Sequence, residues 1–120
     1  MRIAIDAMGG DFGPRATIGG LFLALARHPD LEPSVFGPRA ELCALVAELG
    51  KASGEPSLAK RVRLVDAPRV VLQSTPPMDV FDDPSATSLY GMLAAVCEHE
   101  ADAGITCGNT GALVALARRE

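Results

Sequence analysis

Aromatic residues are scarce in this sequence, and tryptophan is absent. Phe, Tyr and Trp together make up 4% of the 120 residues, whereas hydrophobic residues make up 48%. The core must therefore be aliphatic, which is typical of helices that cover a mostly parallel sheet. The length suits one small domain rather than a two-domain enzyme, so we predict one α/β unit over residues 1–120 with no internal boundary.

Positive charge is also in short supply. The sequence has 11 Lys and Arg residues against 15 Asp and Glu residues, a net charge of −4. This balance excludes a broad basic face for nucleic acid or anionic lipid, but not a local cationic pocket for one small anion. No apolar run approaches the roughly 18 residues of a membrane span, and no signal peptide is evident. We therefore expect a soluble cytoplasmic protein.

Paired cysteines and the common cofactor motifs are missing as well. The three cysteines are widely spaced and form no CxxC motif, which argues against disulfides and a metal site. Cys43 and Cys97 fall on apolar helical stripes and are predicted to be core residues, while Cys107 has no nearby His to activate it as a nucleophile. The sequence contains no G-x-G-x-x-G, P-loop, G-x-S-x-G or H-E-x-x-H motif. We predict no cofactor and no metal.

Strand-like and helix-like segments alternate four times along the chain. The predicted strands are Arg2–Ala7, Leu31–Phe36, Arg61–Ala67 and Ala103–Thr106, and the predicted helices are Arg15–His28, Arg39–Leu49, a third from about Pro84 to His99 and a last one from about Thr110. This order predicts a three-layer α/β/α fold with a mostly parallel sheet and right-handed crossovers.

Several single residues refine these boundaries. Pro33 lacks a backbone N–H, so its strand is expected to lie at an edge or to start at Ser34. Gly50 is the expected C-terminal cap of the second helix, and the polar stretch Lys51–Lys60 is expected to be a loop. Asp83 is the expected N-cap of the third helix. His28 and His99 are placed at helix C-terminal ends, where a cation is favourable.

A glycine-rich turn directly after the first strand is the first candidate site. Gly9, Gly10 and Gly13 allow the backbone to approach an anion closely, and the N-terminus of the next helix adds partial positive charge. Arg15 offers a full charge with bidentate geometry for phosphate. Asp6 and Asp11 are candidate catalytic carboxylates, although Asp11 can equally be a loop acceptor, and the sequence leaves open whether Asp6 acts on substrate or orients loop N–H groups.

A second loop, Gly108–Gly111, also lies between a strand and a helix. Asn109 supplies an amide donor and acceptor, and Thr110 supplies a hydroxyl that can also cap the helix. In open α/β sheets ligands bind outside the carboxyl ends of the strands, so the two loops are expected to form the two lips of one anion site. A purely structural role remains open for each, since glycine-rich turns and helix caps are common without ligands.

Two long blocks resemble one family in order and spacing. Met1–Pro14, MRIAIDAMGGDFGP, resembles the opening of the PlsX phosphate acyltransferases, and Glu100–Arg119, EADAGITCGNTGALVALARR, resembles their second hallmark. Ala24–Leu31 is similar to the end of their first helix. The resemblance spans essentially the whole chain, which corresponds to the N-terminal portion of these longer enzymes.

The resemblance implies a fold, a reaction and partners. The fold is similar to that of phosphotransacetylases and the isocitrate dehydrogenase superfamily. The enzymes transfer a fatty acyl group from acyl carrier protein to inorganic phosphate, giving acyl phosphate for phospholipid synthesis. They are bacterial homodimers of the cytoplasm that associate peripherally with the membrane through a segment beyond the part seen here. Direct attack by phosphate needs no enzyme nucleophile, and loop N–H groups together with Asn109 would orient it.

One region departs from the family pattern. Where the family usually has a Lys-Pro, a basic helical stretch and Ser-Ser-Met, this sequence reads TPPMDVFDDP over Thr75–Pro84. Three aspartates replace the basic residues, which would weaken a contact with an acidic carrier protein. This leaves open a diverged paralogue that uses another acyl thioester, and a non-catalytic fragment or binding module.

Overall fold

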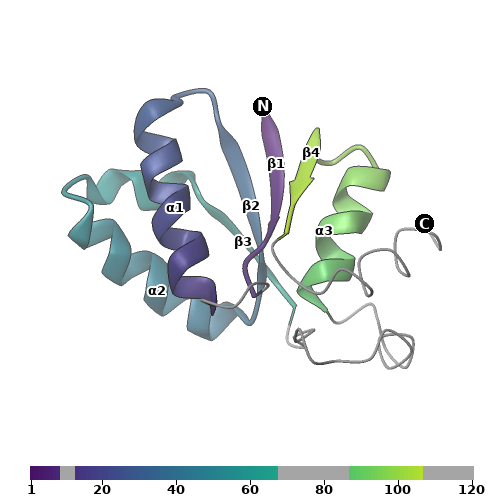
Figure 1. Cartoon of the computed structure of the whole chain (residues 1–120), viewed down its shortest axis with the longest axis horizontal. Coiled ribbons are helices and arrows are strands. Elements are labelled where there is room, and N and C mark those ends of the chain that lie inside the picture. The colour runs from purple at the N-terminus through teal and green to yellow at the C-terminus, as the bar shows by residue number, and fades with distance from the viewer. Residues whose placement is uncertain (9–12, 68–86, 107–120) are drawn as a thin grey trace.

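The part of the chain that the structure describes forms a parallel sheet with helices on both of its faces (Figure 1). The computed structural model describes residues 1–8, 13–67 and 87–106. Within them the strands are β1 (Arg2–Asp6), β2 (Glu32–Gly37), β3 (Arg63–Asp66) and β4 (Ala103–Ile105). The helices are α1 (Gly13–Arg27), α2 (Arg39–Ala52), the short 3₁₀ helix η1 (Pro56–Arg61) and α3 (Ser88–Cys97). The strand order is β3-β2-β1-β4, and every pairing is parallel.

Successive residues of the central strands point into two separate apolar layers. Ile5 and Val35 belong to the layer formed with α1 and α2, while Ala4 and Phe36 belong to the layer formed with α3. Figure 1 shows α1 and α2 on one side of the sheet and α3 on the other. This confirms the predicted three-layer α/β/α fold, built on a largely aliphatic core.

The second strand matches neither predicted alternative, an edge position or a start at Ser34. β2 lies between β1 and β3 and begins at Glu32, one residue before Pro33. The pairing with β3 begins only at Ser34, opposite Arg63, so Pro33 precedes the part of the strand that has neighbours on both sides. An interior strand can therefore carry a proline near its start.

The end of the second helix also differs from the prediction. α2 continues through Gly50 to Ala52, and Gly50 is buried where an added Cβ would lie 3.4 Å from Ala59. That distance is an ordinary van der Waals contact, and the helix instead ends at the C-cap Ser53, which Gly54 follows with φ 82°. Part of the stretch expected to be a loop is η1, whose Leu58 is buried in the layer of α1 and α2.

The third helix starts later than predicted. α3 begins at Ser88, and its N-cap is Thr87, whose backbone is extended and whose hydroxyl accepts a hydrogen bond from Tyr90 N at 3.1 Å. The expected cap, Asp83, lies outside the described residues. At the other end, His99 has φ 62°, and the bonds His99 N to Val96 O and Glu100 N to Ala95 O close the helix.

Both described cysteines are exposed, which contradicts their predicted core positions. Cys43 lies one residue past Leu42 on α2 and therefore faces away from the buried stripe of Leu42 and Val46. Cys97 is the last residue of α3, beyond the buried Ala95. Among the helices that the structure describes, none is long and apolar enough to cross a membrane.

Candidate functional site at the reversal of strand order

The order of the strands reverses between β1 and β4. From β1 the chain moves through β2 to β3 by way of α1 and α2, and it then returns through α3 on the opposite face to β4 on the far side of β1. In open α/β sheets, ligands bind outside the carboxyl ends of the strands at such a reversal. The carboxyl ends of β1 and β4 therefore mark the candidate site.

Asp6 is the last residue of β1 and lies at the centre of this position. The residue is only 4% exposed. One carboxylate oxygen, Oδ1, accepts hydrogen bonds from Met8 N at 3.2 Å and from Ser88 Oγ at 2.5 Å. The other, Oδ2, accepts one from Thr106 Oγ1 at 2.9 Å. We call these four residues the Asp6 cluster.

The donors of the Asp6 cluster come from three segments. Met8 follows β1, and its bond to a side chain two residues earlier is a turn typical of aspartate. Ser88 is the first residue of α3 and is 1% exposed. Thr106 follows β4 directly. A carboxylate at the first turn of α3 is favourable, because the helix N-terminus carries partial positive charge.

Of the other predicted site residues, Gly13 and Arg15 are described. Gly13 is the first residue of α1 and has φ +73°, a conformation that only glycine adopts easily. Arg15 is exposed and donates from Nη2 to Glu48 Oε2 of α2 at 2.8 Å. That bond to Glu48 raises the pKa of Arg15. In this structure the guanidinium thus engages α2 rather than the Asp6 cluster.

The remaining predicted residues lie outside the described part of the chain. These are Gly9, Gly10 and Asp11 of the first loop and Gly108, Asn109, Thr110 and Gly111 of the second. Their roles stay predictions. Both segments nevertheless adjoin the Asp6 cluster in sequence, because Met8 directly precedes the first and Cys107 alone separates Thr106 from the second.

Sequence reasoning missed Ser88 and Thr106 as site residues. Each is a small hydroxyl residue in a position that has a structural explanation of its own, one at a helix start and one at a strand end. Sequence reasoning also missed Asp66 at the end of β3, whose Oδ1 accepts a bond from Arg39 N of α2 at 3.0 Å. An aspartate near the end of a predicted strand was the available signal at both Asp6 and Asp66.

No group of three or more His, Cys, Asp or Glu side chains suited to a metal occurs within residues 1–8, 13–67 and 87–106. The Asp6 cluster instead combines one carboxylate with hydroxyl and amide donors, an arrangement that fixes backbone segments relative to one another.

Comparison with known proteins places these features in context. A family model described as "Fatty acid synthesis protein" matches residues 1–120. The chain is 40% identical over 114 residues to the phosphate acyltransferase of Paracoccus denitrificans (strain Pd 1222), covering 95% of this chain and 29% of that protein. It is 40% identical over 119 residues to the phosphate acyltransferase of Rhodopseudomonas palustris (strain BisB5), covering 98% and 32%.

A more distant relative gives the same picture. The chain is 34% identical over 118 residues to the phosphate acyltransferase of Photobacterium profundum, covering 98% of this chain and 33% of that protein. The chain therefore spans about a third or less of the length of these curated relatives.

Proposed function

Because the chain belongs to the fatty acid synthesis protein family, we propose that it carries the phosphate side of an acyl transfer site. The acyl donor is a fatty acyl thioester of acyl carrier protein, and the acceptor is inorganic phosphate. The observation that supports this most directly is the Asp6 cluster at the reversal of strand order, next in sequence to both glycine-rich segments.

The proposed reaction is a direct displacement. A phosphate oxygen forms a bond to the thioester carbonyl carbon, the carbon–sulfur bond breaks, and the carrier leaves as a thiol after taking up a proton. The products are acyl phosphate and free carrier thiol. Backbone N–H groups of Gly9, Gly10 and Gly108–Gly111, with the Asn109 amide, would hold the phosphate and stabilise the charge that develops on the carbonyl oxygen.

The finer attributes follow from the family resemblance. We propose a homodimer in the bacterial cytoplasm with acyl carrier protein as its macromolecular partner. The acidic segment Thr75–Pro84 supports a second candidate, a paralogue that takes its acyl group from another thioester such as acyl-coenzyme A. A third is a binding module without turnover.

One assay separates these candidates. Thiol release from acyl carrier protein and from acyl-coenzyme A is followed with and without inorganic phosphate, and acyl phosphate is trapped as the hydroxamate. The first candidate predicts phosphate-dependent release from the carrier, and the second predicts a preference for coenzyme A. Phosphate binding in calorimetry without release from either donor indicates the binding module. Release that does not depend on phosphate would contradict the proposed reaction.

A further inference from the structure

We propose that Asp6 is a positioning residue, which fixes the backbone on both sides of the phosphate site and does not itself contact phosphate. This inference rests on the proposed function for the identity of the ligand. Its structural premise, the Asp6 cluster, is independent of that function. The sequence left open whether Asp6 acts on substrate or orients loop N–H groups, and three observations favour the second role.

The first observation is that both carboxylate oxygens are already engaged. Oδ1 receives the Met8 N–H and the Ser88 hydroxyl, and Oδ2 receives the Thr106 hydroxyl. A general base needs an oxygen directed at the proton that it removes. With 4% of the residue exposed, Asp6 offers little surface for a reacting group.

The second observation is electrostatic. Inorganic phosphate carries between one and two negative charges near neutral pH, and a carboxylate in direct contact would repel it. The three donors hold the carboxylate inside the fold, at the junction of β1, β4 and α3. Its charge is compensated there by hydrogen bonds and by the first turn of α3.

The third observation is the place of the three contacts along the chain. Met8 directly precedes Gly9, Thr106 lies two residues before Gly108, and Ser88 begins α3. One buried side chain therefore joins the starting points of both proposed phosphate loops. Groups that hold such a site must keep its geometry within a fraction of an ångström. Loss of the Asp6 hydrogen bonds should therefore reduce the order of both loops together.

The experiment titrates inorganic phosphate into the ¹⁵N-labelled chain and follows the loop amides. The variants are Asp6→Asn, which keeps the shape and removes the charge, and the pair Thr106→Val and Thr106→Ser, of which only Ser keeps the hydroxyl. The matched control is Asp102→Asn. Asp102 also links β4 to β1, but at the amino ends of these strands, whereas Asp6 lies at the carboxyl end of β1. Backbone order parameters report on the loops without ligand.

We expect Asp6→Asn and Thr106→Val to weaken phosphate binding by about tenfold or more, with affinity restored by Thr106→Ser and unchanged in Asp102→Asn. Order parameters at Gly9, Gly10 and Gly108–Gly111 should fall together, while those of α1 and α2 stay constant. The Thr106 pair decides the question if Asp6→Asn fails to fold.

Two results would overturn the proposal. One is tighter phosphate binding by Asp6→Asn, which would mean that the carboxylate faces the ligand. The other is unchanged loop order in Thr106→Val. If the wild-type chain binds no phosphate, the proposed function fails for this chain, while the order parameters still decide whether Asp6 positions the two segments.

Discussion

Arg61 shows how a single side chain can hold the end of a helix in another part of the chain. Its Nη1 donates to Leu25 O at 2.8 Å, and its Nη2 donates to His28 O at 2.7 Å and to Leu31 O at 2.9 Å. These carbonyls lie at or just after the C-terminal turn of α1, which ends at Arg27. A cation is favourable there because the helix C-terminus carries partial negative charge.

Replacing this guanidinium should therefore cost stability. We expect Arg61→Met to lower the free energy of unfolding by about 2 kcal/mol, because three hydrogen bonds to a charged group are lost. Arg61→Lys should lose less stability than Arg61→Met but should remain less stable than the wild type, since an ammonium cannot reproduce the fixed, planar set of N–H donors of a guanidinium. Urea denaturation measures both, with Arg63→Met as the control, because Arg63 is an exposed residue of β3. Equal midpoints for Arg61→Met and Arg63→Met would contradict this role.

The same residues mark how far single positions can be predicted from sequence. Asp6 was identified because it ends a strand before a glycine-rich turn, and both features are local. Ser88 and Thr106 gain their role only because the strand order brings β4 beside β1, and Arg61 gains its role only because η1 packs near α1. Long-range contacts of this kind leave no signature in the local sequence.

At the scale of elements, α3 packs against the sheet through a glycine. A Cβ built on Gly91 would lie 2.6 Å from Cδ2 of the buried Phe36 on β2. On α1, by contrast, a Cβ on Gly20 would meet nothing within 4 Å. Both glycines are in helix interiors, where alanine is intrinsically better by about 0.5–1 kcal/mol.

The two glycines should therefore respond to the same substitution with opposite signs. Gly20→Ala is expected to raise the free energy of unfolding by about 0.5–1 kcal/mol. Gly91→Ala is expected to lower it by about 1 kcal/mol or more, because overpacking a core costs about 1–3 kcal/mol and outweighs the gain in helix propensity. The midpoints of urea denaturation of the two variants and the wild type measure these changes. Stabilisation by both substitutions would mean that α3 does not pack this closely on β2.

Element types were predicted well, and element ends were not. The periodicity of apolar residues identified every strand that the structure describes, and every described helix except the short η1. The errors fell at Pro33, Gly50 and the start of α3. In each case tertiary contacts or capping decided the outcome: the late start of the β2–β3 pairing, the C-cap at Ser53 with Gly54 after it, and the Thr87 cap.

At the scale of the whole molecule, the sequence predicted a parallel sheet but not the order of its strands. Alternating strands and helices predict parallel pairing, yet they do not say that β4 returns to the side of β1. That return creates the reversal on which the candidate site depends. The segment between β3 and α3, which holds Asp83, lies outside the described residues, so its predictions stay open.

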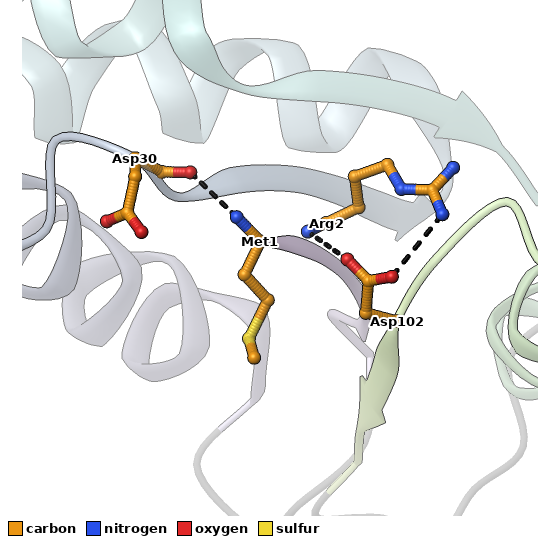
Figure 2. A network of polar contacts seen from close by, with 4 residues as sticks. All are labelled: Met1, Arg2, Asp30 and Asp102. Carbon is orange, nitrogen blue, oxygen red and sulfur yellow. Dashed lines mark hydrogen bonds and ion pairs between the residues drawn. The ribbon is translucent and has the colours of Figure 1, made fainter.

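β4 is also linked to β1 at the amino ends of the two strands, where Arg2 contacts Asp102 (Figure 2). Arg2 N donates to Asp102 Oδ2 at 2.8 Å, and Arg2 Nη2 donates to Oδ1 at 3.3 Å. These bonds, the backbone N–H first, hold the pKa of Asp102 below its ordinary value of 3.8. Beside them the N-terminal ammonium donates to Asp30 O at 2.9 Å.

This contact predicts a definite dependence of stability on pH. A carboxyl group whose folded pKa is depressed stabilises the fold above its unfolded pKa, and that contribution disappears as the pH falls through the folded value. We therefore expect Asp102→Asn to be less stable than the wild type by a constant amount from pH 7 to about pH 5, with the difference shrinking below about pH 4. Urea midpoints across this range measure it.

Asp30→Asn is the matched control, because Asp30 contributes its backbone carbonyl and not its carboxylate to the ammonium contact. Since a backbone N–H bond is the largest cause of the shift at Asp102, added salt should diminish the effect only in part. Parallel curves for Asp102→Asn and the wild type down to about pH 2 would mean that the first and last described strands are not joined through this carboxylate.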